Sequence, residues 1–355
     1  MSRGRRIRAW EIGLALLLAA GAAARAADDF VFAGAQVKSG TSLAGALAVP
    51  AGPDGAATEI PYIVVHGTKK GPVLALVAGV HAYEYPPILS LYRLKGLVDA
   101  KSLRGTLIMV PIANLPSFKK RTIYYGPDDW KNLNRVFPGD PAGTTSQRIA
   151  AALDAEVVQR ADVLVDMHCG DGNEALIPYT YWMISGHKSF DAKTRELALA
   201  FGLPHIIIDE TRGRDLKDSK YLGNTAILRG KPAITTEAGC LGRVDEESIA
   251  RNVRGALSVM RHLGMIEGEP APATDPVWID KYEVVNSRWS GLFAPRVEMG
   301  YYVRQGQIVG TVTDYLGNWK EDVRAPFTGI LLYVIGTPPC NEGEPLFEVG
   351  RVKEK

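Results

Sequence analysis

The chain has 355 residues, of which 46% are hydrophobic and 23% are charged. This balance is typical of a soluble globular protein and excludes a disordered, collagen-like or multi-span membrane chain. The length predicts one large domain with a smaller one. A net charge of +2 gives no support to a nucleic-acid-binding protein, and three cysteines exclude a scaffold built on disulfides.

Residues 1–26 have the three parts of a cleavable secretory signal peptide. A basic start is followed by a short apolar run and a small-x-small site, in the order Arg3, Arg5, Arg6 and Arg8, then Ile12 to Ala20, then Ala24-Arg-Ala26. The apolar run is shorter than a membrane-spanning helix, although an uncleaved N-terminal anchor is the alternative. We therefore expect an exported, periplasmic protein with no stable membrane anchor after cleavage. Neither the general secretory nor the twin-arginine route is favoured.

Cleavage after Ala26 also changes the charge of the chain. It removes five Arg and one Glu, which leaves 36 basic and 38 acidic side chains and a net charge of −2. The positive balance of the full sequence therefore belongs to the signal peptide.

From residue 27 to residue 268, apolar strand-like runs alternate with helix-like segments. Continuous apolar runs predict strands at Val73–Ala78, Thr106–Val110, Ala161–Asp166, His205–Ile208 and Ala233–Thr236. Helices are predicted at Pro86–Leu94, Ser146–Val158, Lys193–Phe201 and Glu246–Leu263. This alternation predicts an α/β domain with a mixed, largely parallel sheet.

The pattern changes after residue 268. Residues 269–276 are rich in Pro and Ala and predict a linker. Beyond them, Gly and Pro interrupt short strand-like runs at Val303–Val312 and Arg324–Val334, and helical periodicity is missing from the sequence. Residues 277–355 are therefore predicted to form a small all-β barrel or sandwich domain.

A histidine and a glutamate follow the first buried strand. His81 and Glu84 are three residues apart on one turn, so an imidazole and a carboxylate can both reach one cation. In α/β sheets, ligands bind beyond the carboxyl ends of the strands, which is where this pair falls. A His-x-x-Glu pair on its own is equally consistent with a surface turn.

A second histidine strengthens the metal interpretation. His168 ends the run Val163-Leu-Val-Asp-Met-His168. Two histidines and one glutamate with an open fourth position form a known catalytic zinc set. The alternative for His168 is a core histidine that is hydrogen-bonded to the backbone.

Two further motifs supply a candidate base and candidate anion-binding groups. Glu237 ends the run Ala233-Ile-Thr-Thr-Glu237, and a buried glutamate must be paired, protonated or catalytic. Beside a metal it can move a proton from water to a leaving amine, whereas a structural ion pair is the alternative. Asn134-Arg135 and Arg121 offer groups for carboxylates, although either arginine alone is also typical of a solvated surface.

Together, in this order, these motifs resemble the succinylglutamate desuccinylase/aspartoacylase family, which shares its fold with the zinc carboxypeptidases. The resemblance runs from about Val64 to Leu263 and implies a zinc-carboxypeptidase-like domain with a C-terminal β-domain that leans over the site. It implies one Zn²⁺ per chain on His81, Glu84 and His168, with Glu237 as general base and acid. It also implies that Asn134 and Arg135 bind a substrate carboxylate and that Arg121 serves a second carboxylate or the scissile carbonyl.

The sequence departs from the family beside the first histidine. The family commonly has Gly followed by Asn or Asp there, whereas this chain has Ala82-Tyr83. The bulkier Tyr83 beside the metal makes the substrate preference an open question.

The resulting hypothesis is an exported zinc-dependent amidohydrolase or deacylase that acts on an N-acyl amino acid or a small acidic amide. A carboxypeptidase-like enzyme for short or cell-wall peptides and a non-catalytic zinc- or solute-binding protein are the alternatives. The expected partner is a small molecule or short peptide bearing a carboxylate, not nucleic acid, and no oligomeric state is predicted. Cys169 and Cys240 follow two of the motif residues and are a candidate disulfide, which would leave Cys340 free.

Overall fold

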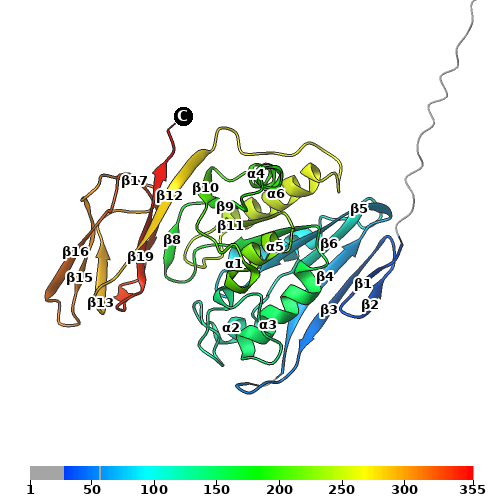
Figure 1. Ribbon diagram of the computed structural model, residues 1–355, viewed down its shortest axis with the longest axis horizontal. Helices are drawn as coiled ribbons and strands as arrows, with labels where there is room; N and C mark the ends of the chain where they lie inside the picture. The colour runs from blue at the N-terminus through cyan, green and yellow to red at the C-terminus, as the bar shows by residue number, and fades with distance from the viewer. Residues whose placement is uncertain (1–27, 56, 355) are drawn as a thin grey trace, which may run out of the picture.

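The computed structural model describes residues 28–55 and 57–354 (Figure 1). The predicted signal peptide lies outside these residues. Within them, no helix is both long enough and apolar enough to cross a membrane.

A mixed sheet runs through most of the molecule. From one edge to the other its strands follow the order β14, β17, β19, β12, β10, β9, β11, β7, β5, β6, β4 and β3, and β8 pairs with β17. The strands up to β11 are β1 Phe30–Phe32, β2 Ala35–Val37, β3 Thr41–Val49, β4 Thr58–His66, β5 Lys69–Ala78, β6 Arg104–Val110, β7 Val163–His168, β8 Glu174–Leu176, β9 Tyr179–Met183, β10 His205–Asp209 and β11 Ala233–Glu237. The predicted α/β class with a mixed sheet is confirmed.

Helices cover both faces of the sheet. They are α1 Tyr85–Lys95, α2 Leu115–Lys120, α3 Thr145–Leu153, α4 Lys188–Phe201, α5 Leu222–Leu228 and α6 Glu246–His262, with the short helices η1 Leu133–Arg135, η2 Asp154–Val158 and η3 Leu216–Asp218. The predicted helix Ser146–Val158 is therefore α3 followed by a π-helical turn, and the helix predicted from Lys193 begins earlier, at Lys188.

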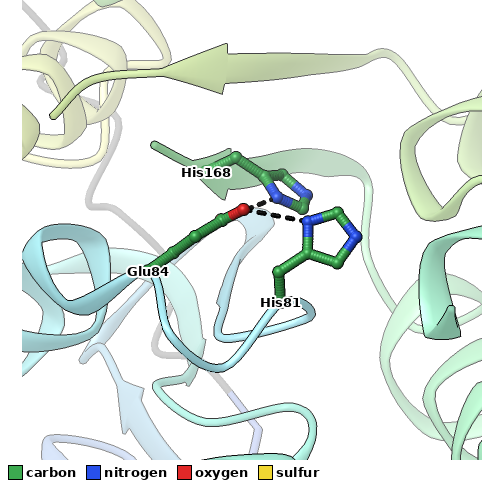
Figure 2. Close-up of side chains that lie close together, drawn as sticks. All are labelled: His81, Glu84 and His168. Atoms are coloured by element: carbon green, nitrogen blue, oxygen red, sulfur yellow. Dashed lines mark hydrogen bonds and ion pairs between the residues drawn. The ribbon is translucent and has the colours of Figure 1, made fainter. Parts of the chain in front are cut away.

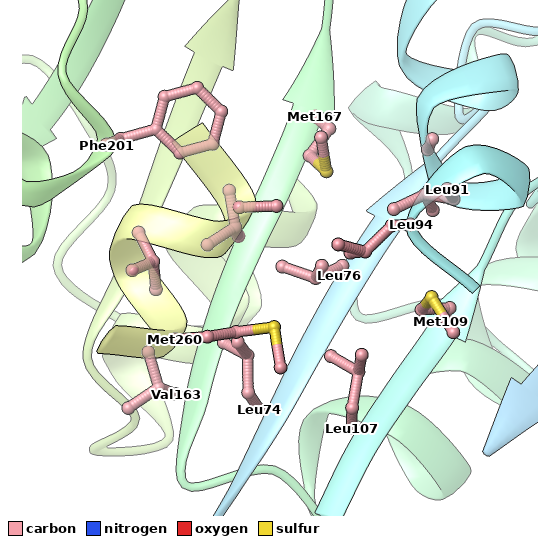
Figure 3. Packing of buried hydrophobic residues seen from close by; sticks show 14 of the residues in the cluster. Leu74, Leu76, Leu91, Leu94, Leu107, Met109, Val163, Met167, Phe201 and Met260 are labelled. Carbon is pink, nitrogen blue, oxygen red and sulfur yellow. The ribbon is translucent and has the colours of Figure 1, made fainter. Parts of the chain in front are cut away.

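The alternation of side chains along β5 explains why this strand is apolar throughout. Leu74, Leu76 and Ala78 enter the core under α1, α4 and α6, whereas Ala75 and Val77 enter the core under α3 and α5. Successive side chains of a strand point to opposite faces, so a central strand between two helical layers needs apolar residues at every position. Figure 3 shows the first of these cores, where side chains of β5, β6 and β7 meet those of α1, α4 and α6.

The chain beyond the predicted linker contains strands and no helix among the described residues. The strands are β12 Val277–Asn286, β13 Gly291–Pro295, β14 Tyr302–Val303, β15 Ile308–Thr313, β16 Trp319–Arg324, β17 Gly329–Ile335, β18 Pro339–Cys340 and β19 Pro345–Val352. Each of the two predicted C-terminal runs is divided between two strands, because turns at residues 304–307 and 325–328 interrupt them. The boundaries of the domains stay predictions.

The strand β12 joins the two parts of the molecule. Its first residues, Val277 to Ile279, pair in parallel with β10, and the remainder pairs antiparallel with β19. The strands β12, β19, β17 and β14 therefore extend the same sheet beyond β10, at the end opposite β1 and β2 (Figure 1). The other C-terminal strands, β13, β15, β16 and β18, form a separate four-stranded sheet. This continuity brings C-terminal side chains to the edge where β7 and β11 end.

Because the cores are closely packed, truncation of a central side chain should destabilise the protein. Leu91 of α1 is fully buried, whereas Leu97, just beyond the same helix, is 57% exposed. We expect Leu91→Ala to lower the free energy of unfolding by about 2–5 kcal/mol, measured by urea denaturation followed by circular dichroism. The control Leu97→Ala should stay within about 0.5 kcal/mol of wild type. Equal losses in the two variants would contradict this description of the core.

Candidate active site

A cavity of about 1100 Å³ opens where β5, β7 and β11 end. The three strands are parallel neighbours, with Ala78 opposite Met167 and His168 opposite Glu237. Their carboxyl ends therefore meet at one edge of the sheet. The cavity is lined by residues of these ends, of the loops beyond them and of the C-terminal strands.

Among the residues that line this cavity, the Glu84 carboxylate lies between two imidazoles (Figure 2). Its Oε1 is 2.9 Å from His81 Nδ1, and its Oε2 is 2.8 Å from His168 Nδ1. One ligand atom from each of the three residues lies within 4.8 Å of the others. The Glu84 and His168 side chains are only 2% exposed. The structure thus brings together the three residues that the sequence predicted as metal ligands.

Local backbone geometry accounts for this convergence. β5 ends at Ala78, and Gly79 turns the chain with a φ of +68°, a conformation that favours glycine. A Cβ on Gly79 would lie 2.9 Å from the Cα of Ile112, so the close passage of this neighbouring segment also requires glycine. The turn places His81 and Glu84 ahead of α1, with Glu84 at the N-cap and Pro86 in the first turn.

Further polar side chains hold the outer nitrogens of both imidazoles. His81 Nε2 is 3.0 Å from Asn132 Oδ1, and His168 Nε2 is 3.0 Å from the buried Asp166 Oδ1. A partner on one nitrogen fixes the ring and leaves the other nitrogen to face the ligand site, as in carboxylate–histidine–zinc arrangements. Asp166 belongs to none of the motifs found in the sequence, although Asp166 and His168 are two residues apart on a strand and so share a face.

The charge at this edge also fits a divalent cation. Burial raises the pKa of Glu84, but the positive charges of His168 and His81 outweigh burial and hold that pKa below its ordinary value. Burial raises the pKa of Asp171 to about 7, and the charge of Glu84 adds to the effect. Burial and the charge of Glu84 also raise the pKa of Glu174. Several carboxyl groups thus crowd together, and two imidazoles with a carboxylate are borderline ligands that suit Zn²⁺.

Glu237 is the last residue of β11 and lies beside the triad. The register of β11 and β7 places it opposite His168, and it lines the cavity. Burial raises its pKa well above the ordinary value, the charge of His168 opposes this, and the charge of Glu84 adds to it. Its buried Oε2 has no hydrogen-bond partner among the described residues. Such a carboxyl group holds a proton readily and has an oxygen free to accept one.

Asn134 and Arg135 also reach the cavity, on η1. Asn134 Nδ2 lies 3.3 Å from His168 Nε2, and Asn134 Oδ1 accepts a hydrogen bond from the backbone N–H of Leu222 at 3.0 Å. Arg135 lies over the Tyr221 ring, with its Cζ 4.7 Å from the ring centroid. Asn134 therefore links the triad to the Tyr221 segment, and the Arg135 guanidinium is available for an anion.

The structure does not bring Arg121 to the cavity. This residue ends α2 in a left-handed conformation, with a φ of +57°, and its side chain is exposed and is not part of the cavity lining. Tyr83 also points elsewhere: its ring lies 5.0 Å from that of Tyr85, and it does not line the cavity. The role expected of Arg121 at the substrate and the expected position of Tyr83 beside the metal therefore find no support in their placement.

Several lining residues carry no motif that sequence reasoning could detect. They come from the loop after α2, from β8 and β9, from the loop after β10 and from the C-terminal strands, and include Tyr124, Glu174, Tyr179, Tyr181, Arg212, Tyr221, Tyr282, Tyr333 and Glu348. Tertiary structure alone brings them together.

The candidate disulfide between Cys169 and Cys240 is not formed. Both residues are free thiols, as is Cys340.

Residues 70–263 match the model of the succinylglutamate desuccinylase/aspartoacylase catalytic domain. The chain is 32% identical over 307 residues to the N-alpha-acetyl-L-2,4-diaminobutyric acid deacetylase of Halomonas elongata. This match covers 84% of this chain and 87% of the relative. These matches confirm the family resemblance predicted from the motifs, and they support an amide-bond deacylase.

Solved structures of related proteins share the fold. A succinylglutamate desuccinylase/aspartoacylase from Rhodobacter sphaeroides is 28% identical with a TM-score of 0.77, over 88% of this chain and 96% of that one. The product-bound ectoine utilization protein EutE (DoeB) from Ruegeria pomeroyi is 26% identical with a TM-score of 0.78, over 87% of this chain and 95% of that one. The predicted fold class is therefore confirmed.

The triad gives a direct prediction about metal content. We expect the purified protein to carry about one zinc per chain, measured by elemental mass spectrometry, because the three ligand atoms converge. His81→Ala and His168→Ala should each hold much less zinc. The control His187→Ala, at an exposed residue before α4, should hold as much zinc as wild type. Unchanged zinc in the His168 variant would refute the ligand set.

Proposed function

Because this chain belongs to the succinylglutamate desuccinylase/aspartoacylase family, we propose that it is a zinc-dependent deacylase that hydrolyses the amide of an N-acyl amino acid. The observation that carries the proposal is that the His81–Glu84–His168 group lies beside Glu237, whose buried carboxyl oxygen has no partner in the part of the chain that the structure describes. The named activity of the Halomonas elongata relative supports an N-acetyl group as the acyl part and makes Nα-acetyl-L-2,4-diaminobutyrate the first substrate to assay.

His81, Glu84 and His168 would hold the zinc ion. When bound there, the ion supplies a Lewis acid that polarises an acyl carbonyl and lowers the pKa of a water molecule to roughly 7. Asp166 and Asn132 keep the two imidazoles oriented with Nδ1 toward Glu84. Their contribution is geometric, since a fixed ring needs no reorganisation when a ligand arrives.

Glu237 moves the proton in this proposal. Its raised pKa, which results chiefly from burial, suits a group that takes a proton from water and returns it to the leaving amine. Glu237 lies opposite His168 on the neighbouring strand, so the base and the ligand group share one edge. Arg135 offers a positive charge to the substrate carboxylate from the same cavity.

A peptidase for short peptides is the second candidate. The cavity of about 1100 Å³ is larger than an acetylated amino acid requires, and it opens between the two parts of the chain. Release of acetate from N-acetyl amino acids favours the deacylase. Release of a C-terminal amino acid from unacylated peptides favours the peptidase. A binding protein without turnover would need no general base, and the placement of Glu237 therefore argues against one.

We expect Glu237→Gln to keep its zinc and to lose hydrolysis by about 10²–10⁴-fold in kcat, since the amide cannot accept the proton. Amine release from Nα-acetyl-L-2,4-diaminobutyrate and zinc content are measured on the same preparation. Glu247→Gln, on the exposed side of α6, is the control and should retain wild-type activity. Substantial residual activity in the Glu237 variant would rule out the role given to this residue.

Export is a separate part of the proposal. The basic start, apolar run and small-x-small site of residues 1–26 support cleavage after Ala26 and a periplasmic location. We expect the protein expressed from the full sequence in a bacterium with an outer membrane to be released by osmotic shock and to begin at Ala27 by N-terminal sequencing. A full-length chain retained in the cytoplasm would contradict export, and one retained in the membrane fraction would indicate the uncleaved anchor.

A further inference from the structure

A second arginine, Arg212, lies in the cavity wall, beyond the end of β10. Its Nε donates a hydrogen bond to Oδ2 of Asp209, the fully buried last residue of β10. Its guanidinium also lies over two aromatic rings, with Cζ 4.1 Å from the centroid of Tyr221 and 5.2 Å from that of Tyr181. A carboxylate and two rings therefore fix both the position and the plane of this group.

This arrangement leaves the outer edge of the guanidinium available. The hydrogen bond that Arg212 forms with the described residues uses Nε, and neither Nη atom has a partner among them. The side chain is 15% exposed, and Arg212 borders the cavity. Two Nη donors in one plane match the two oxygens of a carboxylate.

A chain of contacts connects Arg212 to the triad. The ring of Tyr221 stacks with Arg212. The next residue, Leu222, donates its backbone N–H to the side chain of Asn134. Asn134 in turn contacts His168. Arg135 lies over the same Tyr221 ring at 4.7 Å. Both guanidinium groups therefore belong to the stretch of cavity wall that Asn134 joins to the candidate metal ligands.

A purely structural ion pair with Asp209 is the competing explanation. Asp209 is fully buried and needs a positive partner. However, it also accepts hydrogen bonds from Thr211 N at 3.0 Å, from Thr211 Oγ1 at 2.7 Å and from Tyr282 Oη at 3.0 Å. The Nε–H of Arg212 adds one more hydrogen bond to this carboxylate. Pairing with Asp209 therefore does not account for the two Nη groups, which have no partner among the described residues.

Glu348 of β19 is another carboxyl group that interacts electrostatically with Arg212. Burial raises its pKa to about 8, and the nearby charge of Glu174 adds to this effect. At neutral pH a large share of Glu348 is therefore protonated and does not compete as a full negative charge for the guanidinium.

We propose that Arg212 binds the carboxylate of the N-acyl amino acid and is the fixed anchor that selects acids over their neutral amides. This inference rests on the proposed function for the substrate class. Arg212 thereby takes a role of the kind that the family resemblance implied for Arg121. Arg135, which is exposed, supplements the anchor at the opening of the cavity.

The test measures binding rather than turnover. Zinc-loaded protein with Glu237→Gln is titrated by calorimetry with Nα-acetyl-L-2,4-diaminobutyrate and with its primary carboxamide, which differs in the carboxylate alone. This Glu237→Gln protein is the parent of the variants below, and it should bind the acid more tightly than the amide. Adding Arg212→Lys should weaken binding of the acid by about 10- to 100-fold and leave the amide within about threefold, because lysine keeps a charge near Asp209 but loses the planar fork.

Two further variants keep the test decisive. The pair Asp209→Asn with Arg212→Gln removes both charges together, so no buried carboxylate is left unpaired, and it should also abolish the preference for the acid. Arg214→Gln is the matched control, since Arg214 is exposed, donates to the Ser185 carbonyl at 2.9 Å and does not line the cavity. It should retain the preference of the parent.

The inference is overturned if Arg212→Lys weakens acid and amide equally, or if the parent shows no preference for the acid. It is also overturned if Arg135→Lys alone removes the preference while Arg212→Lys retains it. Failure of the proposed function is seen separately, in a wild-type protein that hydrolyses none of the N-acyl amino acids. The calorimetric preference and its loss with Arg212 do not depend on that outcome.

Discussion

The arrangement of this protein depends on one carboxylate buried between two imidazoles. Glu84 is 2% exposed, and each of its oxygens meets an Nδ1 of a histidine from a different part of the chain. A buried carboxylate is costly unless it is paired, so this contact holds the turn after β5 against the end of β7. Asp166, Asp171, Glu174 and Glu237 add further acidic groups around it. Burial, with the charge of Glu84 adding to its effect, raises the pKa values of Asp171, Glu174 and Glu237. A divalent cation held by the three ligand residues would balance the negative charge of these carboxyl groups. Without it, the protein reduces this charge by protonating some of them.

The sequence could predict this centre because parallel strands align their carboxyl ends. His168 and Glu237 each end an apolar run, and His81 and Glu84 follow another. Once the runs are taken as neighbouring parallel strands, their terminal residues must meet, and the register of β7 and β11 pairs His168 with Glu237. The same logic could have identified Asp166, because a residue two positions before His168 on a strand faces the same side.

The sequence could not predict the parts of the site that depend on distant segments. Arg121 lies in a run of basic residues near other motifs, yet a left-handed turn at the end of α2 leaves it exposed. Arg212 has no motif, and its position is set by Asp209 of β10 and by rings from β9 and from the residue before α5. The strands β1, β2, β3, β4, β8 and β9 were also not predicted, and for β3 and β8 the reason lies in their composition and length. β3 is an edge strand that is mostly exposed and rich in Gly and Ala, and β8 has three residues, so neither shows the apolar run of a central strand.

The continuous sheet also separates two tasks. The triad and Glu237 come from strands and turns before residue 240, whereas Tyr282, Tyr333 and Glu348 reach the cavity from the C-terminal strands. Because β12 pairs with both β10 and β19, these side chains are held by the same hydrogen-bonded sheet that positions the triad. Substitutions in the C-terminal strands can therefore change the shape and charge of the cavity wall without moving the triad or Glu237. A fold of this kind can keep one hydrolytic centre while its substrate changes. The substrate preference of this chain should accordingly depend on Arg212 and the tyrosine-lined wall more than on the motifs that place it in its family.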